Sequence, residues 1–217
     1  MEGTFCFADL AGFTALTEMH GAETAADLVA NFTDLVRNAL QDDGRLIDRI
    51  GDAVFVVCTG PAEGIRFVRR LFVVAGEQPD FPALRAGLHH GEALERDGAF
   101  YGATINLAAR VAAQAHGDQV LATGGVAAAA REQNLRVDSL GAVRLKNVRE
   151  PVELFALHVL GPAAREAIDP VCRMRVSRET AAGHLRHKDV DYWFCSLACV
   201  RQFADDPSSF IGGAFND

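Results

Sequence analysis

The chain has few lysines, tryptophans and tyrosines. Only two of its 21 basic residues are lysine, Lys146 and Lys188, and it contains one Trp and two Tyr. Against 29 acidic residues this gives a formal net charge of −8. Nucleic-acid phosphates are bound by clustered basic side chains, so we expect no nucleic-acid partner.

Long apolar runs are missing as well. The apolar stretches at 54–58 and 71–75 are far shorter than the roughly 20 residues that cross a bilayer. The first ten residues, MEGTFCFADL, have neither the basic nor the apolar region of a secretory signal. We therefore expect no membrane partner and a cytoplasmic location.

The periodicity of the apolar residues predicts an α+β fold. A β-α-β-β-α-β order, continued by further elements, indicates a ferredoxin-like arrangement. Strands are expected at 4–8, 45–50, 53–58, 83–90, 119–123, 135–146 and 152–159, helices at 12–40, 61–75, 104–115 and 125–133, and a polar arm at 91–100. We divide the chain into a domain at 1–160, a linker at 161–168 and a small second unit at 169–212.

Two acidic residues fall where strands of such a sheet meet. Asp9 ends the first strand, and Asp52 lies in the Gly51-Asp52 turn of the next hairpin. The two central strands pair, so the carboxylates converge, and carboxylates this close need bridging cations such as Mg²⁺. Taken singly, Asp9 also reads as a helix cap and Asp52 as a turn residue.

The segment after Asp9 predicts a phosphate site. Gly12, Phe13 and Thr14 begin a helix whose free N–H groups can bind phosphate, and Gly12 allows close approach of the backbone.

A second polar set comes later in the chain. Asn106 and Arg110, four residues apart, share one face of a predicted helix, where an amide and a guanidinium suit a ribose oxygen and a phosphate. Lys146 is a further cation that can reach a polyphosphate. The alternatives are a solvent-facing polar stripe for the first two and a solvated charge for Lys146.

In order along the chain, the motifs FADLAGFT (7–14), IGDAV (50–54), YGATINLAAR (101–110) and LKNV (145–148) resemble the catalytic domain of class III nucleotide cyclases. The resemblance covers about residues 4–158. It implies a homodimer that acts on a nucleoside triphosphate, most simply ATP, and releases a 3′,5′-cyclic nucleotide and pyrophosphate.

The resemblance also implies the roles of the site residues. Asp9 and Asp52, with the Leu10 carbonyl, would hold two Mg²⁺ or Mn²⁺ ions. Asn106 would orient the ribose, Arg110 would neutralise charge at the α-phosphate, and Lys146 would bind the terminal phosphate. In this family the last three come from the other subunit.

Two positions depart from the adenylyl cyclase pattern. Asp48 stands where a lysine usually reads the base, and Ala99 stands where Asp or Thr is usual. The alternative function is therefore a catalytically weak or inactive pseudo-cyclase that binds nucleotide and responds to metal or redox state.

Three of the five cysteines cluster near the C-terminus. Cys6 and Cys58 lie in apolar strands and are expected to be buried. The others, Cys172, Cys195 and Cys199, have a C-x22-C-x3-C spacing that suits Zn²⁺ or another soft metal. The alternative is three buried thiols.

For the fourth ligand of such a site, His184, His187, water or an acid are candidates. The segments DPVCRM (169–174), DYWFCSLACVRQF (191–203) and DPSSF (206–210) resemble a YHS domain, a small metal-associated module. Arg173 replaces the Gly that often follows its first Cys.

Overall fold

The structure, a computed structural model, describes residues 1–161 and 167–211. A seven-stranded sheet with the strand order β2-β3-β1-β4-β7-β9-β8 forms its centre. Its strands are β1 (Glu2–Leu10), β2 (Gly44–Ile50), β3 (Ala53–Cys58), β4 (Leu84–Glu92), β7 (Gln119–Ala122), β8 (Val137–Val143) and β9 (Val152–Leu157). With helices after β1 and β3, the first four strands give the β-α-β-β-α-β order, which confirms the predicted α+β, ferredoxin-like fold.

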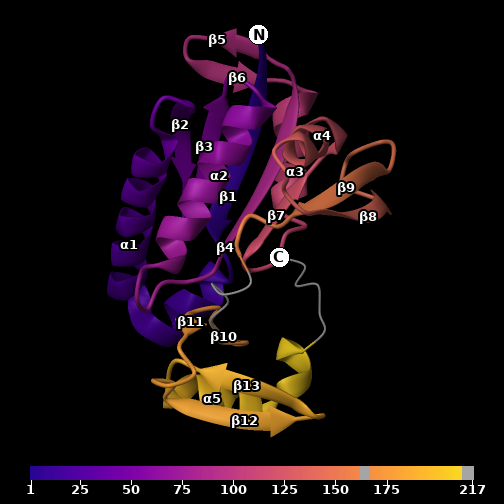
Figure 1. Ribbon diagram of the computed structural model, residues 1–217. Helices are drawn as coiled ribbons and strands as arrows, with labels where there is room; N and C mark the ends of the chain where they lie inside the picture. Colours follow the sequence, from indigo (N-terminus) through magenta and orange to yellow (C-terminus); the bar gives the residue numbers. More distant parts are fainter. Residues whose placement is uncertain (162–166, 212–217) are drawn as a thin grey trace.

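Helices cover both faces of the sheet (Figure 1). They are α1 (Phe13–Leu40), α2 (Pro61–Gly76), α3 (Ala103–Ala112) and α4 (Gly124–Glu132). Side chains alternate along a strand, so β1 sends Cys6 and Ala8 into the core beneath α1, α2 and α4 and sends Phe5 into a second core that includes Ala108 of α3. Gly87 lets α3 pack closely, because a Cβ there would lie 2.1 Å from the backbone nitrogen of Ala112.

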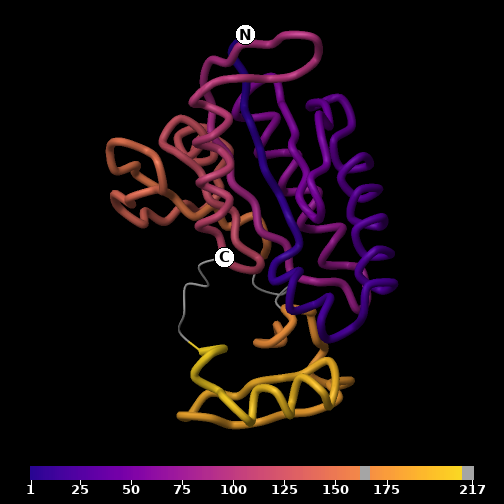
Figure 2. The backbone as a smooth tube through the Cα atoms, turned by 180° about the vertical axis from the view of Figure 1, so that it is seen from behind, coloured from indigo at the N-terminus to yellow at the C-terminus, as the bar shows by residue number. Residues whose placement is uncertain are grey.

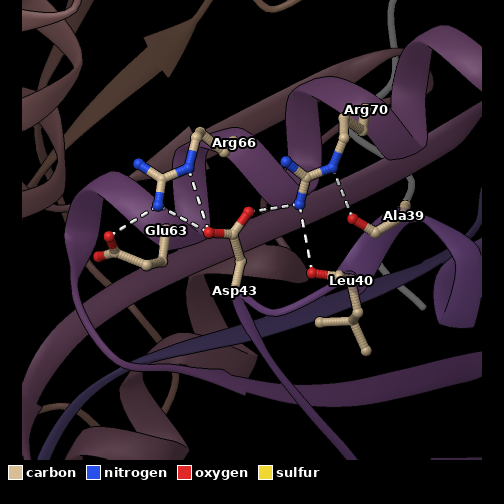
Figure 3. A network of polar contacts seen from close by, with 6 residues as sticks. All are labelled: Ala39, Leu40, Asp43, Glu63, Arg66 and Arg70. Atoms are coloured by element: carbon tan, nitrogen blue, oxygen red, sulfur yellow. Dashed lines mark hydrogen bonds and ion pairs between the residues drawn. The ribbon is translucent and has the colours of Figure 1, made fainter.

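An ion-pair network fixes the end of α1 against α2 (Figure 3). Asp43, 9% exposed, accepts hydrogen bonds from Arg66, with Nη2–Oδ1 2.7 Å, and from Arg70. Arg70 also donates to the backbone oxygen of Ala39, 2.8 Å away, and so caps the last turn of α1. Burial opposes the charged form of Asp43, but the hydrogen bonds from the two arginines outweigh it and lower the pKa of its carboxyl group.

Three elements differ from the sequence prediction. Residues 91–100 are not only a polar arm, because they include strand β5 (Leu94–Arg96) and most of strand β6 (Ala99–Tyr101), which pair as a hairpin. Asp97 and Gly98 both have positive φ, 52° and 79°, as a tight hairpin turn requires. The predicted strand at 135–146 ends at Val143, so Lys146 lies in the following loop. Helix α3 ends at Ala112, three residues earlier than predicted.

The C-terminal part of the chain lies at the opposite end of the molecule from the β5–β6 hairpin (Figures 1 and 2). It contains β10 (Ala167–Ile168), β11 (Arg175–Val176), β12 (Gly183–His187), β13 (Val190–Phe194), α5 (Leu197–Asp205) and a 3₁₀ helix (Pro207–Phe210). Most of the expected linker, 162–166, is outside the described residues, but its last two residues form β10, which pairs with β11.

The apolar core of this C-terminal part is shared with α1. Leu16 and Ala25 of α1 pack in one buried cluster with residues of the C-terminal part, among them Phe194 and Phe203. About 40 residues bury little apolar surface on their own, so contact with α1 supplies part of the burial that such a short segment needs. Among the helices of the described ranges, none has the length and apolar character required to cross a membrane.

Candidate functional site

The β1–β3 ladder brings the two acidic residues together. Asp9 lies opposite Ala53, the residue that follows Asp52, and on its other side it lies opposite Arg85 of β4. The side chain of Asp9 is 17% exposed, and its Oδ1 accepts a hydrogen bond from Nε of Arg85 at 2.6 Å. The convergence expected from the sequence is therefore present within one chain.

The electrostatics of this pair favour a cation. The pKa of Asp9 is raised to about 6, mainly by burial and also by the nearby charge of Asp52, while the hydrogen bond and the charge of Arg85 act in the opposite direction. Burial also raises the pKa of Asp52. Two half-buried carboxyl groups whose pKa values are raised by burial form a donor set that fits a hard divalent cation, with one cationic partner, Arg85, already in contact with Asp9.

The next residues supply backbone groups. Leu10 has its side chain in the core, so only its carbonyl can serve a metal. Gly12 has φ 67°, in the left-handed region, and is the N-cap of α1 without a capping side chain. Phe13 packs in the core and Thr14 is exposed, so this loop offers N–H groups at a helix N-terminus, as predicted.

One predicted base-reading residue shares a face with Asp9. In the ladders, Phe7 lies opposite Phe55, and Phe55 lies opposite Asp48 of β2. Directly opposed residues point to the same face, and Phe7 is on the face of Asp9, two residues away. Asp48 is exposed. Ala99 lies apart, at the start of β6.

Asn106 and Arg110 both lie on α3, whereas Lys146 lies in the loop after β8. Asn106 and Lys146 are exposed and Arg110 is half-buried. Within residues 1–161 and 167–211, the side chains of these three residues make no hydrogen bond or ion pair. The structure therefore does not bring them to Asp9 or Asp52 of the same chain through any polar contact.

The three C-terminal cysteines do converge, and a histidine joins them. The Sγ atoms of Cys172, Cys195 and Cys199 and a ring nitrogen of His20 lie within 4.8 Å of one another. Hydrogen bonds from the other two thiols lower the pKa of the Cys199 thiol, whereas hydrogen bonds to its neighbours raise the pKa of Cys172. The pKa of the Cys195 thiol is raised as well, so Cys199 is the one thiol of the three whose thiolate form is favoured.

The predicted fourth partners are not in this cluster. The Nε2 atom of His184 lies 2.9 Å from Oδ1 of Asp191, and the ring of His187 packs edge-on against Phe203. Of the fourth ligands considered from the sequence, neither His184 nor His187 belongs to the metal-ligating cluster of the described residues. Cys195 also precedes α5, and only Cys199 lies within that helix.

Sequence reasoning missed two site residues, Arg85 and His20. Arg85 stands opposite Asp9 only through the β1–β4 register. His20 lies 152 residues from Cys172, so no local spacing connects them. The sequence holds one indirect signal, the glycine that follows His20 inside a predicted helix. In the structure this Gly21 has φ 84° and ψ 161°, which interrupt α1 next to His20.

Comparison with known proteins identifies the family to which residues 2–159 belong. A sequence model of the adenylate and guanylate cyclase catalytic domain matches residues 2–159, more than half of the chain. The chain belongs to this family. A pH-sensitive adenylate cyclase of Mycobacterium tuberculosis (strain CDC 1551 / Oshkosh) is 35% identical over 156 residues, which are 70% of this chain and 39% of that relative. The adenylate cyclase of Streptomyces griseus is 32% identical over 56% of this chain and 31% of its own length. The chain thus spans well under half the length of these relatives.

Solved structures show the same fold for the cyclase domain, residues 2–159. An adenylate cyclase from Trypanosoma brucei in its monomeric state has a TM-score of 0.67 at 21% identity, over 74% of this chain and 91% of that chain. An adenylyl cyclase from P. aeruginosa has a TM-score of 0.60 at 20% identity, over 74% of this chain and 97% of that one.

Proposed function

We propose that the chain is a nucleotide cyclase that converts a nucleoside triphosphate, with ATP as the first candidate, into a 3′,5′-cyclic nucleotide and pyrophosphate. The observation that supports this most is the convergence of Asp9 and Asp52 beside the N-terminus of α1. In a member of the cyclase family, this places a carboxylate pair next to backbone groups able to bind phosphate.

The reaction is an internal displacement at phosphorus. A bond forms between the ribose 3′ oxygen and the α-phosphorus, the bond from the α-phosphorus to the oxygen bridging the β-phosphorus breaks, and the 3′ hydroxyl proton passes to water. Asp9, Asp52 and the Leu10 carbonyl would hold two Mg²⁺ or Mn²⁺ ions, which when bound supply Lewis-acid stabilisation of the phosphate oxygens. The N–H groups at Gly12, Phe13 and Thr14 bind and orient the phosphates.

We further propose that two chains form the active site together. Asn106 would orient the ribose, Arg110 would neutralise the α-phosphate and Lys146 would bind the terminal phosphate, each on a substrate held by the partner's carboxylates. Support comes from their side chains, which have no polar partner in the described residues of their own chain. Exposed apolar side chains of Ile50, 64% exposed, and Leu94, 63% exposed, offer surface for such a contact.

A direct assay tests the reaction. The chain is incubated with ATP, GTP, CTP or UTP in the presence of Mn²⁺, and the products are identified by mass spectrometry. We expect a cyclic mononucleotide with at least one substrate, and loss of at least 99% of this product in Asp52→Asn, whose fold is checked by circular dichroism. A folded, dimeric wild-type chain that makes no cyclic product from any of the four would refute the proposal.

A mixing experiment tests the shared site. Asp9→Asn and Asn106→Ala are each expected to be inactive alone. In an equal mixture about half of the dimers are heterodimers with one intact site of two, so about a quarter of wild-type activity should return. Asp9→Asn mixed with Asp52→Asn is the matched control. Both changes damage the carboxylate pair, so every active site of the mixed dimers is defective and no activity should return. Equal activity in the two mixtures would exclude the shared arrangement.

Asp48 and Ala99 favour the second candidate function, a weak or inactive pseudo-cyclase that binds nucleotide. An ionised carboxylate at position 48 only accepts hydrogen bonds, so it cannot donate one to a base edge as a lysine does, and lost base contacts cost selectivity. Asp48→Lys combined with Ala99→Asp should raise turnover of ATP relative to GTP. No activity in either the wild-type or the double variant, with nucleotide still bound, would favour the pseudo-cyclase.

We also propose that residues 169–212, of which position 212 lies outside the described residues, form a YHS-like module appended to the cyclase domain. The clustered cysteines and the small β12–β13 hairpin beside α5 support this. Zn²⁺ is the cofactor that we propose for it, with the clustered cysteines among its ligands.

A further inference from the structure

The four residues of the cysteine cluster come from three places in the chain. His20 lies on α1 in the cyclase domain, and Cys172 lies in the turn between β10 and β11. Cys195 lies between β13 and α5, and Cys199 lies in the first turn of α5. Cys172 and Cys199 are fully buried. The cluster therefore sits in the contact between the cyclase domain and the C-terminal part, not inside the C-terminal part alone.

Four of the six separations lie close to those of one tetrahedral metal site. With Zn–S bonds of ~2.3 Å and a Zn–N bond of ~2.0–2.1 Å, tetrahedral angles place sulfur atoms ~3.8 Å apart and nitrogen ~3.5 Å from sulfur. Cys195 Sγ lies 3.8 Å from Cys199 Sγ and 3.3 Å from Cys172 Sγ. His20 Nε2 lies 3.4 Å from Cys172 Sγ and 3.5 Å from Cys195 Sγ. A disulfide would need ~2.05 Å.

We propose that His20, Cys172, Cys195 and Cys199 form a single Cys₃His site for a soft divalent cation of the Zn²⁺ type, and that His20 of the cyclase domain closes it. Three thiolates and one imidazole are a closed structural ligand set for zinc. The metal then joins two parts of the chain that meet around α1.

A buried carboxylate orients the ligands. Asp169 is fully buried, and its Oδ1 accepts the backbone N–H of Val171 at 2.8 Å. Its Oδ2 accepts the N–H of Cys195 at 2.9 Å. One side chain thus fixes both the turn that carries Cys172 and the segment that carries Cys195, as outer-sphere groups of metal sites do.

The site is linked to the predicted phosphate loop by two hydrogen bonds. The carbonyl of Arg173, next to Cys172, accepts the N–H of Ala83 at 2.9 Å, and the carbonyl of Ala83 accepts the N–H of Ala11 at 2.9 Å. Arg173 also covers Gly12, where a Cβ would lie 2.6 Å from its Cγ. A metal that holds Cys172 therefore holds the turn on which the loop at 11–14 rests, and its removal should loosen that loop. This consequence concerns order in the loop and does not depend on catalysis.

Metal titration of the reduced, full-length chain tests the site. We expect one Zn²⁺ per chain, and with Co²⁺ the intense visible bands of a tetrahedral thiolate site. His20→Ala should weaken Zn²⁺ binding at least tenfold and change the Co²⁺ spectrum, and His20→Cys should restore tight binding. His184→Ala is the matched control and should match the wild type. Unchanged affinity and spectrum in His20→Ala, or no metal bound by the reduced wild type, would overturn the proposal.

Hydrogen exchange tests the link to the loop. Amides of residues 11–16 should exchange faster after chelation of the metal, and His20→Ala should show the same fast exchange in the presence of Zn²⁺. The β5–β6 hairpin at the far end of the molecule is the internal control and should not change. Equal exchange of residues 11–16 with and without metal would overturn the link. Because neither measurement uses nucleotide, failure of the cyclase proposal would leave both results interpretable.

Discussion

Arg175 offers the sharpest test of how the C-terminal part is held. Its side chain is 1% exposed, and its Nη2 lies 2.5 Å from Oδ1 of Asp118. Its Nη1 donates to the backbone oxygens of Ala75 and Pro82, each at 3.1 Å. A single guanidinium from β11 thus satisfies one carboxylate and two carbonyls of the cyclase domain.

Arg175→Met keeps much of the volume and removes every donor of the side chain. Breaking a buried ion pair by removing one partner costs about 3–5 kcal/mol. Asp118 is 17% exposed and keeps some water, so we expect the lower end, about 3 kcal/mol of unfolding free energy. Urea unfolding followed by circular dichroism and tryptophan fluorescence measures this, because the single Trp193 lies in the C-terminal part.

Two further variants make the result decisive. Arg186→Met removes an exposed arginine of the same part, whose side chain is 62% exposed, and should change stability by less than about 0.5 kcal/mol. Combining Arg175→Met with Asp118→Asn should cost less than the sum of the single changes, because the unpaired carboxylate is gone. A loss below about 1 kcal/mol in Arg175→Met, or additive costs in the double variant, would refute the reasoning.

Three other changes should act on separate parts of the fold. Gly87→Ala should cost at least about 3 kcal/mol by driving α3 off β4, whereas Gly125→Ala, with open space around it, should be nearly neutral in thermal unfolding. Asp43→Asn should cost about 2 kcal/mol at pH 7. Because the folded pKa of Asp43 is lowered, its contribution is present above the unfolded pKa and disappears as the pH falls through the folded value, so the stabilities of wild type and variant should converge in acid. A difference that stays constant with pH would show that the ion pairs do not cause it. Phe203→Ala, at a residue 1% exposed, should cost about 3–5 kcal/mol, and a loss of under 1 kcal/mol by urea unfolding would show that the core shared with α1 is not tightly packed.

Local sequence patterns were enough to predict the main sheet and its helices. Apolar alternation, the Gly51-Asp52 turn and Pro61 at the start of a helix act over a few residues, and the corresponding elements lie within a few residues of their predicted bounds. The β5–β6 hairpin was missed although its Asp97-Gly98 pair is a strong hairpin signal. The end of β8 at Val143, before Lys146, was missed as well, and Asn147 in the loop that follows has a positive φ of 62°.

The sequence by itself determined the cyclase motifs, the β-α-β-β-α-β order and the meeting of Asp9 with Asp52, because adjacent strands in a known order leave little freedom in their pairing. Only the tertiary structure decided that Arg85 contacts Asp9 and that His20, rather than His184 or His187, meets the cysteines. Those contacts join residues 76 and 152 positions apart. Their energies depend on strand register and on the packing of α1 against the C-terminal part, and neither is encoded in any short stretch of sequence.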